Sequence, residues 1–370
     1  MNKIRLSNPV RLIAFFLTAI LLIVSFGFTV DGWQAVERPG GTPPVSMTPP
    51  TDDPVGEDEG KNPDNDGNLP EEPKPIFYNR LSGLECSEEL SLKAHLAFIM
   101  NPSLDSYGAS EADLICSFPT ENGQERWCVF ISETKNLWKI GSITPTRGYI
   151  SNIVEYFGGI CVSNGVDDKL EYNSCSISKK HFDLSGGDYK YSEFVSNVYT
   201  NRDLIEAGLA DSDIDTSISD KTVLPFDFNA PSNEKIVFES KADCITVTSS
   251  TEVNELRYNA ELGKYELYKN SSSVTDKIGN KTLNFENCFV LFADSVTYDN
   301  SEYSQTVVDT IGGGRGYYFT NGTYTKISWT GSKEGVMTFY TTDGQRLSVN
   351  PGKSFISFLK ASTEKNLIIG

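Results

Sequence analysis

Residues 112–131 read ADLICSFPTENGQERWCVFI, two apolar runs separated by a short polar turn. The turn at residues 121–123 is Glu-Asn-Gly, and an Asn-Gly pair between apolar runs favours a β-hairpin. Cys116 and Cys128 lie symmetrically about the centre of this turn, so the hairpin makes them cross-strand neighbours. We therefore predict a sheet near the start of the folded region.

The residues around this hairpin mix two periodicities. Apolar residues run through Leu92–Met100 and Ile160–Val162 in the manner of buried strands, whereas Gly148–Phe157 and Glu193–Ala207 have spacings close to helical. The mixture predicts a mixed α/β domain at residues 77–210.

The second half of the chain has the pattern of a β-domain. Many short strand-like runs follow one another, and Asn321-Gly322 and Asp343-Gly344 supply turns that two-residue hairpins require. We predict a mostly antiparallel β-domain at residues 223–362, after a polar, acidic hinge at residues 211–222. The predicted fold class is α+β.

The first thirty residues predict contact with a membrane. A basic N-terminus at residues 1–11 precedes an uncharged, largely apolar run at residues 12–30. A helix of this length spans about 28 Å, close to the hydrocarbon thickness of a bilayer. Basic residues before the run predict a single-pass anchor with the C-terminal domains outside the cytoplasm. A cleaved signal peptide is the alternative, and it also places the protein outside.

Residues 31–76 have the composition of a disordered linker. Ten of the chain's 17 prolines lie there, and Thr51–Pro75 carries nine acidic residues against two lysines. Such a segment cannot bury enough apolar surface to offset its chain entropy. Residues 62–67 resemble the start of a calcium loop, but the prolines prevent the flanking helices. We predict no metal site.

The charge of the chain excludes one class of partner. The 370 residues contain 32 Lys and Arg against 50 Asp and Glu, a net charge of −18, and residues 76–370 alone carry −13. A protein of this charge cannot neutralise the phosphates of a nucleic acid, so we predict none as partner. Two histidines and no C-x-x-C pair give no support to a metal centre or to a cofactor, and we expect neither.

Several side chains are candidates for chemistry, each with a plainer alternative. Outside the cytoplasm, Cys116 and Cys128 are close enough in a hairpin to form a disulfide, or they are two buried thiols. Arg126 and Arg147 lie near turns and are able to bind an anion, although ion pairs with neighbouring carboxylates are the better explanation. His95 lies in an apolar run and is better explained as a packed imidazole than as a general base.

Short motifs along both predicted domains resemble the YerB-like lipoprotein family, an envelope family of undefined role. The motifs and their order carry the resemblance: Asn79–Leu84, Ser110–Ile115, Glu121–Arg126, Ile140–Arg147, Asn197–Thr200, Leu224–Phe228, Asp343-Gly344 and Pro351-Gly352-Lys353. The resemblance implies a two-domain envelope protein. This chain departs from the family by lacking its lipid-bearing cysteine, and by carrying Ser163 and Ser196 where the family has histidine.

These observations lead to one functional expectation and two alternatives. We expect a membrane-anchored, extracytoplasmic protein with a non-catalytic binding or scaffolding role at the bacterial cell envelope. Its partner would be an envelope protein or a cell-wall component, and an enzyme is disfavoured. The alternatives are a cell-wall glycan-acting enzyme that uses carboxylates, and a receptor for a small anion or other ligand. The ligand-binding candidates are Arg126, Arg147, Glu121, Asn164 and Tyr199, with no catalytic residue proposed.

Overall fold

β-Strands are the main regular structure of the described residues, far exceeding helices, and the C-terminal region is rich in them. The structure is a computed structural model, and it describes residues 75–167, 180–194, 197–218, 223, 225–248, 252–299, 304–332 and 336–370. The predicted anchor at residues 12–30, nearly all of the predicted linker and Ser196 lie outside the described residues. Within the described residues, no helix combines the length and the apolar character needed to cross a membrane.

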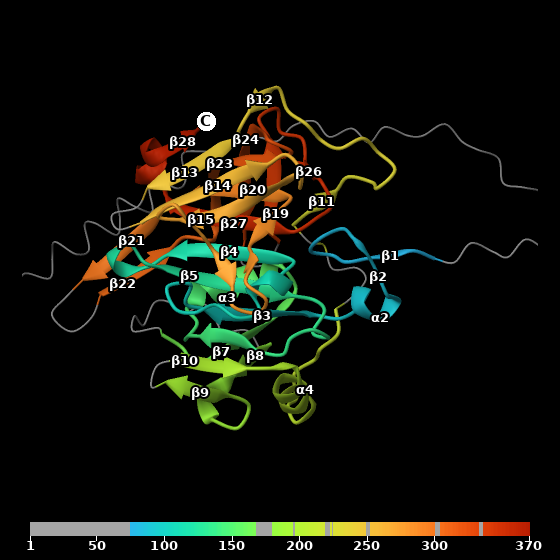
Figure 1. Cartoon of the computed structure of the whole chain (residues 1–370), viewed down its shortest axis with the longest axis vertical. Helices are drawn as coiled ribbons and strands as arrows, with labels where there is room; N and C mark the ends of the chain where they lie inside the picture. Colours follow the sequence, from blue (N-terminus) through green and yellow to red (C-terminus); the bar gives the residue numbers. More distant parts are fainter. Residues whose placement is uncertain are drawn as a thin grey trace, which may run out of the picture. The chain divides into compact units, whose positions relative to one another are not determined.

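One large sheet organises the fold (Figure 1). Its strands in spatial order are β12 (Ser240–Lys241), β24 (Thr323–Gly331), β23 (Gly312–Thr320), β20 (Asn287–Ala293), β27 (Ser354–Lys360), β4 (Leu114–Pro119), β5 (Glu125–Ile131), β3 (His95–Met100), β6 (Ile140–Ile143), β10 (Asn197–Thr200) and β9 (Tyr191–Phe194). Three further strands branch from it: β25 (Thr338–Thr341) beside β24, β7 (Gly159–Ser163) beside β3, and β8 (His181–Asp183) beside β7.

A six-stranded antiparallel sheet covers part of the large one. It contains β16 (Ser272–Ser273), β15 (Lys264–Lys269), β14 (Val253–Asn259), β13 (Cys244–Thr248) and β28 (Leu367–Ile369), with β19 (Asn284–Phe285) beside β15. Four two-stranded pairs complete the described strands: β1 (Phe77–Tyr78) with β2 (Glu85–Cys86), β11 (Asp227–Phe228) with β26 (Ser348–Val349), β17 (Thr275–Asp276) with β18 (Lys281–Thr282), and β21 (Ser295–Asp299) with β22 (Ser304–Val308).

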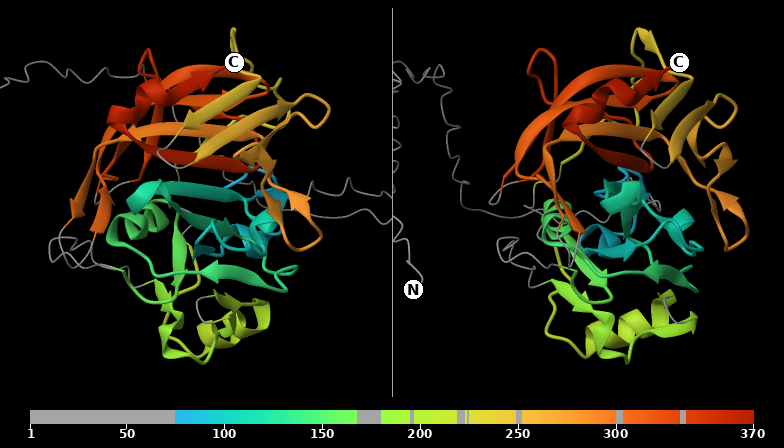
Figure 2. Two further views of the ribbon diagram at one scale, coloured as in Figure 1. Left: turned by 60° about the vertical axis from the view of Figure 1, so that its left-hand side comes forward. Right: turned by 90° about the vertical axis from the view of Figure 1, so that its left-hand side faces the viewer.

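Strand β27 joins the two halves of the chain into one sheet. It runs parallel to β20 on one side and parallel to β4 on the other. Figure 2 shows the result, with the red C-terminal strand beside the teal N-terminal ones. The hinge predicted at residues 211–222 therefore does not separate two sheets, and the described residues from 75 onward belong to one compact unit.

The hairpin predicted from residues 112–131 is confirmed. Strands β4 and β5 pair in antiparallel register with Cys116 opposite Cys128, and a 3-10 turn at Glu121–Gly123 connects them. The period-2 alternation of β5 decides its packing. Trp127, Val129 and Ile131 face one hydrophobic cluster, and the side chains between them face the other.

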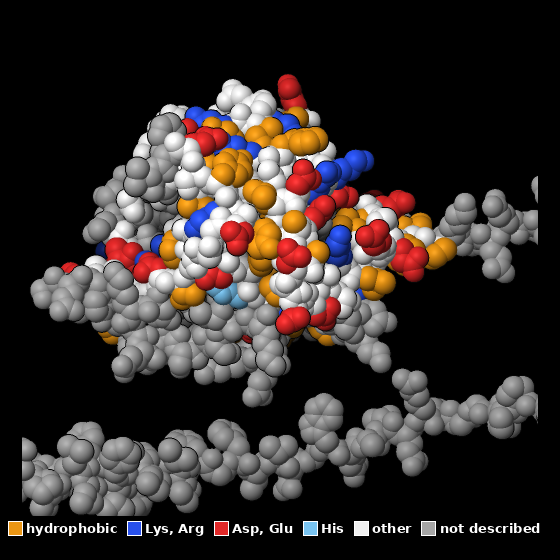
Figure 3. Space-filling view, turned by 90° about the horizontal axis from the view of Figure 1, so that it is seen from below, with side chains coloured by type: hydrophobic (Ala, Val, Ile, Leu, Met, Phe, Trp, Pro, Cys, Tyr) orange, Lys and Arg blue, Asp and Glu red, His pale blue; other side chains and the backbone are white. Residues whose placement is uncertain are grey.

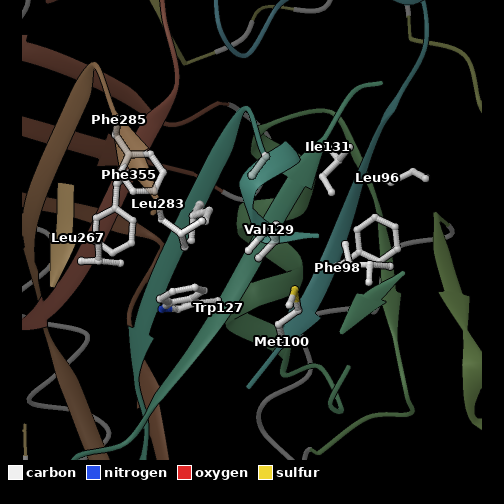
Figure 4. Close-up of a cluster of buried hydrophobic side chains, with 14 of the residues drawn as sticks. Leu96, Phe98, Met100, Trp127, Val129, Ile131, Leu267, Leu283, Phe285 and Phe355 are labelled. Carbon is white, nitrogen blue, oxygen red and sulfur yellow. The ribbon is translucent and has the colours of Figure 1, made fainter. Parts of the chain in front are cut away.

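The first cluster fills the space between the two sheets. Figure 4 shows Trp127 and Val129 on the side of Leu267, Leu283 and Phe355, which come from or next to strands far along the chain, whereas Ile131 lies toward Leu96 and Phe98. The second cluster lies on the opposite face of the large sheet. It includes α3 (Gly148–Tyr156), whose buried residues Tyr149, Ile150, Ile153 and Val154 recur at helical spacing.

The N-terminal half is richer in strands than the predicted mixed α/β domain. In the described residues of that half, the α-helices are α2 (Glu88–Ser91), α3 and α4 (Arg202–Ala210), and strands predominate. The helix predicted at residues 193–207 is wrong in its first half, where β9 and β10 occur instead. Val198, Tyr199 and Thr200 pair with β6, and the helix begins only where the Asn201 side chain accepts a hydrogen bond from the Leu204 N–H.

Candidate functional site

Four predicted or neighbouring charged residues, Glu121, Arg126, Arg147 and Asp167, form what we call the arginine cluster. Arg147 is only 3% exposed, and its guanidinium donates to both oxygens of Glu121, at 2.8 and 3.0 Å. The same guanidinium donates to Oδ2 of Asp167 at 3.0 Å. The planar guanidinium of arginine presents several N–H donors in fixed directions, so one arginine can bind two carboxylates at once. The single ammonium of lysine lacks this fixed geometry.

Segments distant in sequence supply these side chains. Glu121 lies in the turn between β4 and β5, Arg147 immediately precedes α3, and Asp167 follows β7. Arg147 also donates to the carbonyl of Thr306 in β22, while the Thr306 N–H donates to Glu121. The cluster therefore ties four separate segments together.

Burial and pairing set the protonation of the cluster. Burial alone would raise the pKa of Glu121 and of Asp167, but hydrogen bonds and charge from Arg147 hold both pKa values below their usual ones. For Arg147, burial acts to lower the pKa, and its bonds to Glu121 and Asp167 raise it overall. All of these groups are charged at neutral pH.

Arg126 is less well satisfied than Arg147. Its Nη2 lies 3.4 Å from Asp167, and its Nη1 is buried without a hydrogen-bond partner in the described structure. Burial, followed by the charge of Arg147, lowers the pKa of Arg126. Both guanidinium groups thus face carboxylates, which is the ion-pair explanation that we kept as the alternative. A ligand role for the two arginines stays a prediction.

The remaining predicted ligand-binding residues lie elsewhere. Asn164 accepts a 2.6 Å hydrogen bond from Lys190. Tyr199 is 1% exposed, and its ring lies 5.5 Å from that of Tyr107 and 4.0 Å from the Lys139 ammonium. No hydrogen bond joins either residue to the arginines in the part of the chain that the structure describes, so the predicted set does not form one site.

Cys116, Cys128 and His95 are buried, and His181 is partly buried. Cys116 and Cys128 are cross-strand neighbours, and both are free thiols in the structure. Their disulfide therefore stays a prediction. His95 contacts the Ser132 hydroxyl at 2.8 Å, and burial, with the charge of Arg80, lowers the pKa of His95 to about 3. His181 contacts Ser163 at 2.8 Å.

A groove of about 540 Å³ lies beside the arginine cluster. Tips and ends of several elements form its walls, and their side chains are mainly hydroxyl, amide and charged: Thr120, Glu121, Thr248, Thr297, Asp299, Ser304, Thr306, Lys360, Thr363 and Asn366, with Pro119, Gly123, Val247 and Leu359. We call it the threonine groove. Glu121 belongs both to its wall and to the arginine cluster.

A second cavity, the lysine pocket, was missed by sequence reasoning. Lys264, Lys281 and Lys353 line a space of about 480 Å³. Lys353 was noted only within Pro351-Gly352-Lys353, and the other two lysines belong to no motif. Their assembly depends on pairings between distant strands, which no local signal shows. No group of three or more metal-ligating side chains occurs within the described ranges.

Comparison with known proteins identifies two similarities. Residues 245–356 match a family described as the C-terminal domain of a protein of unknown function, DUF3048. The crystal structure of the YerB protein from Bacillus subtilis is similar at 18% identity with a TM-score of 0.67, covering 80% of this chain and 99% of that one. No curated protein matches this chain in sequence.

Proposed function

Because residues 245–356 match the DUF3048 C-terminal domain family and the fold is similar to that of YerB, we propose that this chain is a YerB-like, non-catalytic binding or scaffolding protein at the bacterial cell envelope. In this proposal, residues 12–30 anchor the chain and the β-rich unit lies outside the cytoplasm. The threonine groove is the surface that receives the partner, an envelope protein or a cell-wall component.

The arginine cluster beneath the groove is the observation that carries this proposal. Arg147 holds the β4–β5 turn, the loop after β7 and β22 against one another, and two of these segments form walls of the groove. A surface built on such fixed elements needs little reordering on binding, which reduces the entropic cost of association. The groove exposes mostly apolar surface with hydroxyl and amide groups set within it, which suits a peptide or the ring faces and hydroxyls of a polyhydroxylated polymer.

Charge supports the choice of a local surface over the whole molecule. Figure 3 shows acidic and basic side chains interspersed over the face seen from below rather than gathered by sign. At a net charge of −18, long-range attraction of an anionic polymer is disfavoured. We therefore expect the partner to be recognised through short-range contacts in the threonine groove.

Site-specific photo-crosslinking in cells tests the proposal. A photo-crosslinking amino acid replaces Thr248, which is exposed in the groove, in the full-length chain, and Asp213, exposed after α4, is the matched control. We expect a discrete crosslinked product from position 248 and none from position 213. Identical products at both positions, or none at position 248, would contradict a role for the groove.

Fractionation of the same cells tests the location. We expect the full-length protein in the membrane fraction. In cells whose outer layers have been removed but whose cytoplasmic membrane is intact, we expect added protease to digest the protein. Recovery of protease-resistant protein in the cytosol would overturn the envelope proposal independently of the groove.

A small-anion receptor is the second candidate function. It is favoured by the lysine pocket, which contains three ammonium groups in an acidic protein.

A further inference from the structure

The lysine pocket is formed by four regions of the chain. The 3-10 turn Ala109–Glu111 with Ala112 forms one wall, and Lys264 at the start of β15 contributes another. The segment Lys281–Phe285, which contains β18 and β19, and Lys353 before β27 complete it. The space of about 480 Å³ falls within the range of small-ligand sites.

The lining of the pocket has an excess of positive charge. It contains three lysines and one carboxylate, that of Glu111, which lies 3.2 Å from the Lys281 ammonium. Lys264 pairs with Glu286 at 2.7 Å. Lys353 forms no ion pair with a described carboxylate, and its ammonium donates to the Ser110 carbonyl at 2.6 Å. The excess is notable because the protein as a whole is strongly acidic.

Lys353 is a largely buried cation without a paired anion. Burial lowers the pKa of Lys353, although the charges of Asp113, Glu111 and Glu286 act in the opposite direction. The Glu286 carboxylate does not reach the ammonium as an ion pair; it pairs with Lys264 and accepts a hydrogen bond from the Lys353 backbone N–H at 2.8 Å. An unpaired ammonium in a low-dielectric wall is costly and favours an anionic ligand.

Ser110 supplies a second, independent observation. The residue lines the pocket, but its hydroxyl oxygen is covered by the surrounding wall and has no hydrogen-bond partner among the described residues, so it reaches a ligand only when the side chain turns toward the cavity. Buried hydroxyls in proteins are nearly always satisfied, so an unsatisfied one at a cavity wall indicates a missing partner.

The wall that carries Ser110 is fixed in place. Asp276 in β17 is fully buried, and its carboxylate accepts hydrogen bonds from the N–H groups of Gly108 at 3.1 Å and Ser110 at 2.8 Å. These two backbone N–H groups therefore already donate to Asp276 and are not available to a ligand. An anion in the pocket would meet lysine ammonium groups and the Ser110 hydroxyl rather than those backbone donors.

We propose that the lysine pocket is a binding site for a phosphoryl group. A tetrahedral phosphoryl anion presents oxygens in several directions, which suits three ammonium groups and a hydroxyl arriving from different walls. Lysine ammonium groups act as point charges towards phosphate, whereas a planar carboxylate is better matched by an arginine fork. The remaining volume accommodates an organic substituent on the phosphoryl group. This site is separate from the threonine groove and does not depend on it.

Calorimetric titration of the full-length protein in detergent tests this site. The probes are inorganic phosphate, glycerol 3-phosphate as a monoester, glycerophosphoglycerol as a diester, and acetate as a carboxylate control. We expect saturable binding of at least one phosphoryl probe and weaker binding of acetate. Stronger binding of the monoester or of the diester identifies which source of the phosphoryl group the pocket takes. Absence of saturable binding by every phosphoryl probe overturns the proposal.

Three variants and one control assign the binding to this pocket. Lys353→Gln and Lys281→Gln should each weaken binding about tenfold or more, because each removes a charged hydrogen-bond donor. Ser110→Ala should weaken binding about threefold without lowering the melting temperature, since the hydroxyl has no partner in the free protein. Lys326→Gln, an exposed change of the same charge on β24, should leave binding unchanged.

The variants also separate the proposal from general charge effects. Lys281 is exposed in the free protein, so a folding defect is not expected when it is changed. If Lys281→Gln and Ser110→Ala bind like the unaltered protein, or if Lys326→Gln weakens binding equally, the pocket is not the site. The outcome of the crosslinking experiment in the threonine groove does not depend on the result for the lysine pocket.

Discussion

The arginine cluster and the lysine pocket each gather cations in an acidic protein, but they differ in how the charges are satisfied. Arg147 is 3% exposed and its guanidinium donates to two carboxylates and a backbone carbonyl. In the lysine pocket, Lys353 reaches only a carbonyl, and the nearby Ser110 hydroxyl has no partner. The donors of Arg147 are bonded to acceptors within the protein, whereas the lysine pocket keeps donors that can bind a ligand.

This difference shows what separates a structural ion cluster from a binding site. A buried charge with its partner removed is strongly destabilising, so the cluster should respond to substitution with a loss of stability. A pocket that awaits its anion should respond with a loss of affinity and little change in stability.

The largest effect is expected from Arg147→Met. It leaves Glu121 and Asp167 as partly buried carboxylates without their main partner, and we expect the free energy of unfolding to fall by about 3 kcal/mol. Denaturant unfolding measures this value. Arg126→Met is the matched control in the same cluster, and it should cost about 1 kcal/mol because Nη1 of Arg126 makes no hydrogen bond. Equal losses in the two variants would contradict the role given to Arg147.

A smaller effect is expected on acidification. The folded pKa values of Glu121 and Asp167 lie below their usual values of 4.5 and 3.8, so the unfolded chain takes up protons first as the pH falls. Their contribution to stability is therefore present above those usual values and is lost as the pH falls through the lower, folded pKa values.

Unfolding measured as a function of pH checks this expectation. Glu121→Gln should flatten the dependence of stability on pH below about pH 4.5, because one of the two linked protons is removed. Glu234→Gln, an exposed change of the same type, should leave the slope unchanged. A slope unaffected by Glu121→Gln would show that the cluster does not contribute to acid sensitivity.

The smallest effect on stability is expected from Lys281→Gln. The substitution removes the ion pair with Glu111, but exposed ion pairs contribute little to stability. We therefore expect the free energy of unfolding to change by no more than about 0.5 kcal/mol in the absence of ligand. Denaturant unfolding in phosphate-free buffer measures it. A loss comparable with that of Arg147→Met would remove the distinction between the two regions.

Local features of the chain were predictable from the sequence. The β4–β5 hairpin with Cys116 opposite Cys128 follows from the turn at residues 121–123 and from the apolar runs beside it. The helix α3 follows from helical spacing at residues 148–157. Both depend on contacts between residues near in sequence, where pattern and turn chemistry decide the structure.

Features that depend on distant pairings were not predictable. Glu193–Ala207 has helical spacing, yet residues 197–200 form β10, which lies between β9 and β6, and these strand pairings override local preference. The lysine pocket likewise requires Lys264, Lys281 and Lys353 to meet through strands from separate parts of the chain. Arg126 and Arg147 were singled out as anion ligands, but the sequence does not show that Glu121 and Asp167 reach them.

The position of β27 has a consequence for the order in which the protein folds. Residues 354–360 are synthesised after both strands that they separate, β20 and β4. Until β27 arrives, each of those strands has an open edge, and no direct pairing closes the sheet between them. The nascent chain therefore has to keep two unpaired edges apart from other chains. A truncation before residue 354 would leave both edges open permanently, and aggregation rather than a smaller folded protein is the expected product.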